Sequence, residues 1–544
     1  EETPALSPQA SSAIDAGLGQ LGAIANALEN LEAYGENLPL IGASVGGLVD
    51  PQVAIMQTIQ ARLSALLGSL PRVSQVTSAI ESWDGTTYAG FTTSVKGVLA
   101  HYGSSSSEPV WWDVSLELVP SPVTRALQNL SGSLFDAAFT GTPTVSVKGG
   151  VVLDIAFGYE IGPGFFLAID AVGLSARVNA TGLDGFGFGF NTPAGTQNLG
   201  VTGGSIDLKA AVLATPDDSI LTGGRITQAT LSTLSAANIG NAFNLQKIGS
   251  LYASLPLTGS LSFPGFALAG TYVVRVQSDD LFTRTPQLSI EVDSTLTVMG
   301  QTLAGRFVLK NTGTQTVLEA RDVVFQLGAG ATRVLKVQNG SGTFVLLDNG
   351  LAGRLEADFE LGPAIPNITV NAGGLSLLLN TSPGAVPEVA GSSVNLPAGP
   401  YYRVCGHGTV GLSNPEALLE ADFVFEPRDA DSNLGNGYEE VAASVAHLNF
   451  GFGDGSSRIL GVTDGAGAFV FRSDGIVGVA SASLVLAVPA VGMSGSFSVS
   501  VNNTAAPYNQ TVTVNGSTLM VDVDVGPFLR IGGAGVTLTV QGMD

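Results

Sequence analysis

The stretch RVLKVQNGSGTFVLLDNGLAG, residues 333–353, returns 125 positions later as RILGVTDGAGAFVFRSDGIVG, residues 458–478, with no gap between the copies. The copies share an arginine, a phenylalanine, valines and glycines at fixed offsets. Self-similarity at a fixed period is the sequence signature of a repeat protein, in which each repeat is one structural unit. The shared glycines stand where strands turn or pack closely, not around a reactive side chain. We therefore interpret the repeat as a building unit.

The repeat extends well beyond this stretch. NTSPGAV at residues 380–386 matches NTAAPYN at 503–509, and GPYYRV at 399–404 matches GPFLRI at 526–531. STLTVMGQT begins the first full copy at residue 294, and the last residues, VTLTVQGMD, resemble that beginning. Segments with weaker similarity to these occur earlier in the chain.

These matches divide the sequence into four parts. We predict a helical N-terminal segment, a divergent β-rich region and two β repeats, at residues 1–87, 88–290, 291–417 and 418–544 respectively. A unit of this length is too long for one coil of a narrow solenoid, and it fits several stacked coils or a sandwich-like module. The junction LLEADFVFE, residues 418–426, has a continuous strand pattern, so we expect neighbouring units to share sheets.

Residues 9–83 have the period of helices. Apolar residues recur at spacings of three and four from Ile14 to Leu31, which predicts one amphipathic helix. Asp50-Pro51 combines a capping carboxylate with proline at the first helical position, and it predicts the start of a second helix. The spacing of Val73, Val76 and Ile80 predicts a third, shorter helix.

From about residue 88 the period changes to two. In RLEADFEL, residues 354–361, apolar and charged residues alternate, which is the pattern of a half-buried strand. Asn339-Gly340, Asp464-Gly465 and Asp474-Gly475 are turn signals, and they predict hairpin turns. The predicted fold is mainly β: an elongated stack of long antiparallel β-sheets, either solenoid-like or made of fused β-sandwich modules, with an N-terminal α-helical segment.

Composition excludes several classes of protein. Of the 544 residues, 45% are apolar and 12% are charged, which excludes a disordered chain. The 22 basic and 45 acidic residues give a net charge of −23, which repels nucleic acids and anionic lipids. No apolar run is long enough to predict a transmembrane segment, and the first residues lack a signal-peptide pattern. The single cysteine, Cys405, predicts no internal disulfide.

An acidic insertion within RDADSNLGNGYEE, residues 428–440, distinguishes the second repeat from the first. Asp429, Asp431 and Asn433 occupy alternate positions and Glu440 is the twelfth residue counted from Asp429, which is the ligand spacing of a calcium loop. Leu434 stands where such a loop has glycine, so a solvated hairpin loop is the other interpretation. We predict calcium as the one metal that these four residues would bind, and no required cofactor.

No arrangement of residues predicts catalysis. GASVG, residues 42–46, matches the G-x-S-x-G nucleophile pattern, but it joins two predicted helices, and a tight loop around Ser44 is the better interpretation. Cys405 and His407 lie in CGHG, and the second copy has Ala534 in place of His407. No carboxylate pair stands out, and no nucleophile has a base beside it, so we predict that the protein is not an enzyme.

Residues 294–544 resemble a known group of proteins. LAGRF, GSGTFVLLDNGLAG, NTS, LPAGPYYRV and LTVQG are similar to segments of tandem modules in very large secreted or surface-attached bacterial repeat proteins, described as adhesin-like or calcium-binding. The resemblance implies secretion or a cell-surface location, and it carries no family active site.

These observations predict a non-enzymatic extracellular structural repeat protein. We expect a surface stalk, an adhesin or a fibre subunit that self-associates by sheet-edge or head-to-tail contacts, because open sheet edges accept strands of neighbouring chains. The alternative is a calcium-stabilised adhesion module that binds surface glycans. We expect no nucleic-acid partner.

Overall fold

The computed structural model describes residues 2–29, 32–105, 108–129, 138–193, 195–235, 238–259, 261–264, 266–284, 286–298, 301–311, 315–327, 335–361, 368–413, 416–428, 440–453, 458–486, 488 and 490–540. The chain forms two units. Unit 1 comprises Glu1–Phe190, Asn198–Thr258 and Val273–Leu288, and unit 2 comprises Asn191–Gln197, Gly259–Tyr272 and Ser289–Asp544. The fold is mainly β with antiparallel strands, as predicted, and its longest helices lie near the N-terminus.

The N-terminal helices lie where the apolar spacing predicts them. They are α1 (Pro8–Glu29), the 3-10 turn η1 (Glu32–Gly35), α2 (Pro51–Ile55), the π-helical turn η2 (Met56–Gln60), α3 (Ala61–Leu67) and α4 (Val73–Glu81). Asp50 is the predicted cap, since its Oδ1 accepts a hydrogen bond of 2.8 Å from the backbone N–H of Val53. Pro51 occupies the first helical position, where a missing N–H has no cost.

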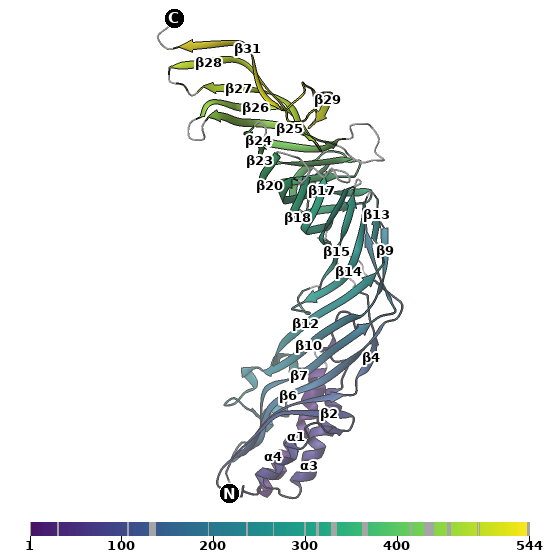
Figure 1. The fold of residues 1–544 in the computed structure, drawn as a ribbon. Coiled ribbons are helices and arrows are strands. Elements are labelled where there is room, and N and C mark those ends of the chain that lie inside the picture. The colour runs from purple at the N-terminus through teal and green to yellow at the C-terminus, as the bar shows by residue number, and fades with distance from the viewer. Residues whose placement is uncertain are drawn as a thin grey trace. The chain divides into compact units, whose positions relative to one another are not determined.

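Unit 1 is built on an antiparallel sheet that these helices cover. Its successive neighbours are β2 (Phe91–Tyr102), β3 (Val110–Pro120), β6 (Thr144–Glu160), β7 (Gly164–Leu183), β10 (Gly204–Pro216) and β12 (Phe243–Thr258). Helix α1 contacts β6 and β7, and α4 contacts β2 (Figure 1). Gly17 allows the close approach of α1, because a Cβ at this position would lie 2.1 Å from the ring of Phe165. The apolar face of the helix therefore packs directly on the sheet.

The elements between residues 87 and 278 are β1 (Thr87–Tyr88), β2 (Phe91–Tyr102), β3 (Val110–Pro120), β4 (Val123–Ala126), β5 (Ala138–Thr140), β6 (Thr144–Glu160), β7 (Gly164–Leu183), β8 (Gly187–Thr192), β9 (Gly195–Val201), β10 (Gly204–Pro216), η3 (Asp218–Ile220), β11 (Ile226–Thr227), α5 (Gln228–Leu231), α6 (Ile239–Ala242), β12 (Phe243–Thr258), β13 (Leu261–Phe263) and β14 (Phe266–Ser278). The region predicted only as divergent β material thus also contains short helices.

The rest of the chain consists of long strands. They are β15 (Gln287–Val298), β16 (Gln301–Asn311), β17 (Thr316–Leu327), β18 (Leu335–Leu347), β19 (Gly350–Leu361), β20 (Ile368–Asn380), β21 (Val386–Val389), β22 (Ser392–Leu396), β23 (Tyr401–Ser413), β24 (Glu416–Arg428), β25 (Glu440–Gly453), β26 (Arg458–Arg472), β27 (Gly475–Leu486), β28 (Val491–Asn502), β29 (Tyr508–Val514), β30 (Ser517–Val523) and β31 (Phe528–Val540).

The long strands of unit 2 form an antiparallel meander. Each one from β15 to β20, then β23 to β28, then β31, pairs with the next. The same order occurs twice: β16 to β20, a hairpin and β23 are followed by β24 to β28, a hairpin and β31. The repeat seen in the sequence is thus six ladder strands with one inserted hairpin. The boundary residues 291, 417 and 418 stay a prediction.

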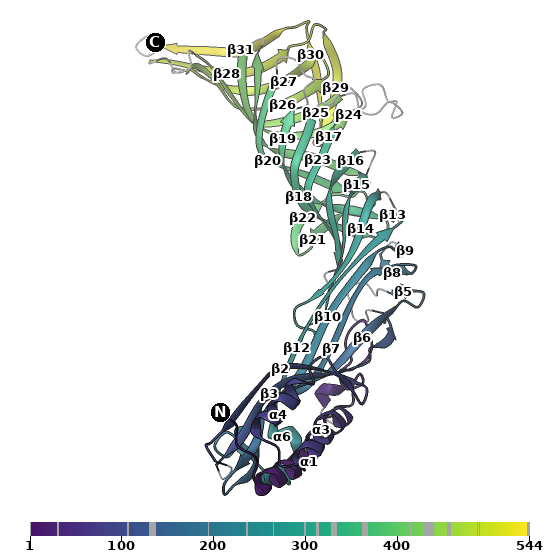
Figure 2. The ribbon, with the colours of Figure 1, turned by 60° about the horizontal axis from the view of Figure 1, so that its bottom comes forward.

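Each inserted hairpin covers one face of its own repeat. In the first repeat, Val386, Val389 and Leu396 of β21 and β22 pack on Val345 and Ala352 of the ladder. In the second, the corresponding cluster joins the β29–β30 hairpin to β25, β26 and β27, and it consists of Ala442, Ala468, Val470, Val477, Tyr508, Val512, Val514, Val521 and Val523. Figure 2 shows both hairpins lying against the ladder. Each hairpin therefore adds an apolar cluster to its own repeat.

A buried asparagine holds each hairpin at its base. Asn380 and Asn502 are 0% exposed. The Nδ2 of Asn380 donates to the carbonyl oxygens of Gly384 (2.8 Å) and Pro397 (2.6 Å), so it joins the two ends of the hairpin. The Nδ2 of Asn502 donates in the same way to Ala506 and Asp524, at 2.7 Å each. The structural partner of Asn380 is thus Asn502, one residue before the position that the sequence match NTS to NTA indicates.

The Oδ1 atom of each asparagine completes the network. It accepts hydrogen bonds from the backbone N–H and the hydroxyl of the residue two positions later, Ser382 or Thr504, at 2.8 to 2.9 Å. Gly399 and Gly526, each before a cis proline, lie against these loops. A Cβ at either glycine would lie 2.2 Å from the carbonyl oxygen of the asparagine, so only glycine fits.

Two of the three predicted hairpin turns are wrong. Asn339 and Asp464 lie inside β18 and β26, with φ of 55° and 53°, at points where the register with the next strand shifts. Left-handed Asn or Asp before Gly fits a β-bulge as well as a two-residue turn, and only the pairing of the neighbouring strands distinguishes them. Asp474-Gly475 does connect two strands, since Arg472 of β26 pairs with Gly475 of β27.

We predict that Asn502→Ala lowers the free energy of unfolding of the second repeat by about 2–4 kcal/mol, because each buried backbone group left unpaired costs about 1–3 kcal/mol. The matched control is Asn509→Ala in the same hairpin, whose exposed Nδ2 bonds Asp522. This surface change should stay within about 0.5 kcal/mol. Urea unfolding followed by circular dichroism measures both variants, and equal losses would contradict the role of the buried amide.

Candidate functional site

Side chains that can carry chemistry gather at three places in unit 2. The first is a buried ionic cluster at the base of the second hairpin. The second is a cavity at the corresponding place in the first repeat. The third is a group of histidines and carboxylates on β23, β24 and β25.

The ionic cluster is centred on Glu440, the first residue of β25. Its Oε2 accepts hydrogen bonds from Nη1 of Arg428 and from the Tyr508 hydroxyl, the latter at 3.1 Å. Its Oε1 lies 3.7 Å from Nε of Arg472. Nη1 of Arg428 also donates to the Tyr508 oxygen at 2.6 Å, and its Nη2 donates to Gln510 at 2.6 Å. The cluster therefore fastens the β29–β30 hairpin to the ends of β24, β25 and β26.

The cluster changes the chemistry of its tyrosine. Burial, together with the negative charge of Glu440, raises the pKa of Tyr508 to about 12. The phenol is neutral at physiological pH, as an ordinary tyrosine is, and it donates to Glu440 and accepts from Arg428. Breaking such a buried pair by removing one partner leaves a charge uncompensated, which gives the arrangement a structural role.

The structure places one of the four predicted calcium ligands. Asp429, Asp431 and Asn433 lie outside the described residues. Glu440 is described, and both of its carboxylate oxygens already face arginine side chains. Its carboxylate therefore already has two cationic partners. Among the described residues, no group of three or more His, Cys, Asp or Glu side chains is arranged to hold a metal ion.

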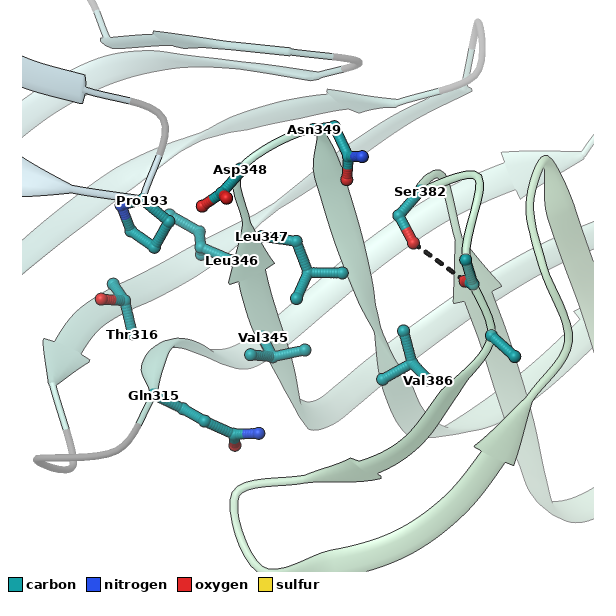
Figure 3. Close-up of a pocket in the computed structure, with 12 residues that line it drawn as sticks. Pro193, Gln315, Thr316, Val345, Leu346, Leu347, Asp348, Asn349, Ser382 and Val386 are labelled. Carbon is teal, nitrogen blue, oxygen red and sulfur yellow. Dashed lines mark hydrogen bonds between the residues drawn. The ribbon is translucent and has the colours of Figure 1, made fainter.

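A cavity of about 510 Å³ lies at the corresponding place in the first repeat. Gln315 and Thr316 line it at the start of β17, and Asp348 and Asn349 line it at the turn after β18. Figure 3 shows Leu347 pointing toward its centre. The remaining lining residues come from β18, from the loop that follows Asn380 and from the turn after β8, and they are Val345, Leu346, Ser382, Gly384, Ala385, Val386 and Pro193.

The cavity exists because smaller side chains replace the ionic cluster. Thr316 pairs with Leu346 as Val441 pairs with Phe471, so Gln315 corresponds to Glu440 and Leu347 corresponds to Arg472. Asn380 and Asn502 make equivalent hydrogen bonds, so Val386, six residues after Asn380, corresponds to Tyr508, six residues after Asn502. A leucine and a valine thus stand where the second repeat has an arginine and a tyrosine.

The lining of the cavity combines polar and apolar groups and is nearly uncharged. Thr316 and Ser382 are buried and contribute hydroxyl groups. The single hydroxyl hydrogen of Ser382 is shared between Oδ1 of Asn380 (2.9 Å) and the carbonyl oxygen of Gly384 (3.0 Å, Figure 3). Gln315 Oε1 accepts a hydrogen bond of 2.8 Å from the backbone N–H of Ala390. Asp348 is the only charged residue among those that line the cavity. The lining suits a neutral ligand with hydroxyl or amide groups.

The third site places two histidines on one carboxylate. Nδ1 of His407 lies 2.9 Å from Oδ1 of Asp422, and Nδ1 of His447 lies 2.7 Å from its Oδ2. Nε2 of His407 also lies 3.3 Å from Oε1 of Glu420. The hydrogen bonds to Asp422 raise the pKa of both imidazoles, and those of the two imidazoles lower the pKa of Asp422. Asp464 adds to the shift of His447.

Sequence reasoning missed this histidine cluster. Its members lie on three strands, and the antiparallel register brings them together: His407 is directly opposite Asp422, and a bulge at His447, with φ of 52°, directs the second imidazole toward the same carboxylate. The strand register is the signal that would have found it, because the pairing of Ser413 with Glu416 between β23 and β24 places residues 407 and 422 opposite each other.

The other residues singled out in the sequence have structural environments. Ser44 Oγ accepts a hydrogen bond of 3.1 Å from the N–H of Gly47, within the loop between two helices. Burial raises the pKa of the Cys405 thiol, which is the reverse of what a reactive thiolate needs.

Comparisons of the chain with protein-family models, with curated proteins and with solved structures find no match. None of the helices in the described part of the chain is long and apolar enough to cross a membrane.

We predict that Asp422→Asn lowers the melting temperature more at about pH 5.5 than at about pH 8. The imidazole pKa values are higher in the folded protein than the unfolded value of about 6.5, so their contribution to stability is complete below that pH and is lost as the pH rises through the folded values. The lowered pKa of Asp422 makes its contribution present above about pH 4 and lost on acidification. The contributions of the histidines and of Asp422 to stability are therefore both present between about pH 4 and about pH 6.5.

The matched control for this prediction is Asp358→Asn on β19, an exposed carboxylate that accepts a hydrogen bond from Asn339 and touches no histidine. Differential scanning calorimetry at the two pH values measures the loss in each variant. A loss for Asp422→Asn that is equal at both pH values would show that the histidines do not titrate through this carboxylate.

Proposed function

We propose that the protein is a non-enzymatic structural repeat protein of the cell surface or extracellular space, which serves as a stalk, an adhesin or a fibre subunit. One observation carries this proposal: the two repeats share their packing devices and differ in their reactive side chains. Asn380 and Asn502 make the same bonds, and Gly399 and Gly526 make the same close contacts. The two repeats therefore have in common the contacts that build the sheet.

The reactive groups, in contrast, occur once. Glu440, Arg472 and Tyr508 correspond to Gln315, Leu347 and Val386, and His407 corresponds to Ala534. An enzyme needs a nucleophile, an acid or a base held beside a substrate site. In the described residues Glu440 faces arginines and Asp422 faces histidines of the same sheet. This arrangement supports a mechanical or adhesive role.

Self-association is part of the proposal. A strand at the edge of a sheet presents unpaired N–H and C=O groups, to which another chain can add a strand. The outer edge of β31 has no strand beside it among the described residues, since β31 pairs with β28 alone. The net charge of −23 keeps copies apart except where uncharged surfaces meet.

We expect electron microscopy of the purified chain to show ordered assemblies whose abundance rises with protein concentration. Open sheet edges drive this assembly, and addition of a mild denaturant should reverse it. Sedimentation velocity over the same concentrations gives an independent measure. Single particles alone, at the highest soluble concentration, would rule out the fibre subunit.

The cavity of the first repeat favours a second candidate function, the binding of surface glycans. Its volume of about 510 Å³ lies within the range of about 300–1,000 Å³ typical of ligand sites. Hydroxyl, amide and carboxylate groups line it beside the apolar side chains of Pro193 and Leu347. A sugar presents the same combination of hydroxyl groups and apolar ring faces. The calcium-stabilised form of this candidate rests on Asp429, Asp431, Asn433 and Glu440.

We predict that Asp348→Ala weakens glycan binding at least about tenfold, because a hydrogen bond to a charged group contributes about 1.5–3 kcal/mol. Val386→Tyr should abolish binding by filling the cavity with the side chain found in the second repeat. Ser473→Ala, the change at the position equivalent to Asp348, is the matched control and should bind normally. A glycan array and then titration calorimetry with the best array glycan test these variants. A silent array for the unmodified chain would contradict this function.

A further inference from the structure

Three cations lie directly opposite one another on the sheet of unit 1. In the strand register, Lys148 of β6 pairs with Arg177 of β7, and Arg177 pairs with Lys209 of β10. The Cα atoms of such opposed residues lie about 4.5–5.5 Å apart, and like charges placed this way destabilise a sheet. Three of the 22 basic residues in the chain thus stand in one row, which we call the basic row.

The basic row lies on the face of the sheet that the helices do not cover. Side chains alternate between the two faces along a strand. The sequence neighbours of the three cations are buried on the other face, and Val147, Ala176 and Leu208 are each 0% exposed. A Cβ at Gly149, next to Lys148, would lie 3.0 Å from the Cβ of Leu48 in the loop that precedes α2. The cations therefore point to solvent, and the side chains of Arg177 and Lys209 are 58% and 65% exposed.

Carboxylates compensate the basic row only in part. Glu117 of β3 lies 3.3 Å from Nη2 of Arg177, and Asp207 of β10 lies 3.1 Å from Nζ of Lys209. Lys148 has no hydrogen bond or ion pair within the described part of the chain. Exposed ion pairs contribute little to stability, so these two pairs do not account for placing three cations side by side. The row keeps a positive charge that a bound anion would compensate.

An exposed aromatic ring stands at the end of the basic row. Lys209 pairs with Ser250 of β12, and Tyr252 lies two residues further along, on the same face. Tyr252 is 49% exposed. Its hydroxyl donates to Oδ1 of Asp279 at 3.1 Å and accepts from Nε2 of Gln277 at 3.2 Å. These bonds hold the ring in place, and a held tyrosine offers apolar surface to a ligand at low entropic cost.

This combination fits an acidic glycan better than a nucleic acid. A nucleic acid carries dense negative charge along its whole length, and the net charge of −23 repels it everywhere except at the basic row. Salt screens exposed charges beyond about 8–10 Å, which is close to the length of a row across three strands about 4.8 Å apart. A short glycan with a few acidic groups therefore interacts mainly with the cations, and its rings have apolar faces that suit Tyr252.

We propose that the basic row of Lys148, Arg177 and Lys209, together with Tyr252, binds an anionic glycan whose carboxylate or sulfate groups face the cations. This inference rests on the adhesive role in the proposed function. It adds to that role a class of ligand and a surface in unit 1, other than the cavity of the first repeat.

Titration calorimetry of the full chain tests the class of ligand. The probes are a hexasaccharide of galacturonic acid, a sulfated hexasaccharide, and the galacturonic acid hexasaccharide with its carboxylates converted to methyl esters. One or both acidic probes should bind, and the uncharged ester should bind at least about tenfold more weakly than the better acidic probe. Added salt should weaken the binding, because exposed charges are screened. Single-stranded DNA that binds more tightly than either acidic probe would overturn the assignment to a glycan.

Charge reversal tests the surface. Lys148→Glu should weaken binding of the better acidic probe at least about tenfold, because it places a like charge against the ligand. The matched control is Lys96→Glu, the same change at an exposed lysine of β2 outside the row, and it should bind normally. Tyr252→Leu should weaken binding and leave its salt dependence unchanged, because it removes no charge. Thermal unfolding of each variant shows whether it is folded.

The outcomes separate this inference from the proposed function. If neither acidic probe binds, or if Lys148→Glu binds like the unmodified chain, the site on the basic row is overturned and the stalk or fibre role stands. Val386→Tyr, which fills the cavity of the first repeat, should leave the binding of the acidic probes unchanged. A loss of that binding in Val386→Tyr would assign the ligand to the cavity and overturn the basic row.

Discussion

Each repeat depends on satisfying the backbone groups that an inserted hairpin buries. When the chain leaves the ladder after β20 or β28 and returns at β23 or β31, carbonyl groups at the base of the hairpin lose contact with water. Asn380 and Asn502 donate to one carbonyl on each side of that base and accept from the loop between. One buried amide thus replaces four hydrogen bonds to solvent. Without it these backbone groups would be buried and unpaired, which destabilises the position of the hairpin on the sheet.

That constraint explains why the two repeats look alike in some positions and unlike in others. The asparagine, the residue two places later and the glycine against the loop form one unit of close contacts, so they recur together. The space beside the hairpin is less constrained. The second repeat fills it with Glu440, Arg472 and Tyr508, and the first leaves a cavity around Leu347 and Val386. The sheet tolerates both because the hairpin is already held from its base.

Local sequence patterns predicted helices and strands. The candidate sites depend on which strands pair, and local patterns do not determine that pairing. The cap at Asp50 and the alternation in β19 depend on neighbours in sequence, and both were predicted. Asn339-Gly340 was predicted as a turn, but it forms a bulge inside β18. The left-handed geometry of Asn339 suits both structures, so the local sequence does not distinguish them. Glu440 was predicted as a calcium ligand, but Tyr508, which bonds it, is 68 residues away. The pairing of His447 with Asp422 depends on a bulge that no local pattern specifies.

In a meander, each strand pairs with its neighbours in sequence, so every added strand stabilises the sheet by pairing with the strand before it. An open sheet of this kind always has edge strands with unpaired backbone groups. Side chains on an edge strand can hinder or permit the addition of another strand. At β2 the charged and titratable side chains of Lys96 and His101 oppose strand addition. In β31 the residues from Val536 to Val540 are valine, threonine and leucine and carry no charge. The two strands thus differ in chemistry although both belong to antiparallel ladders.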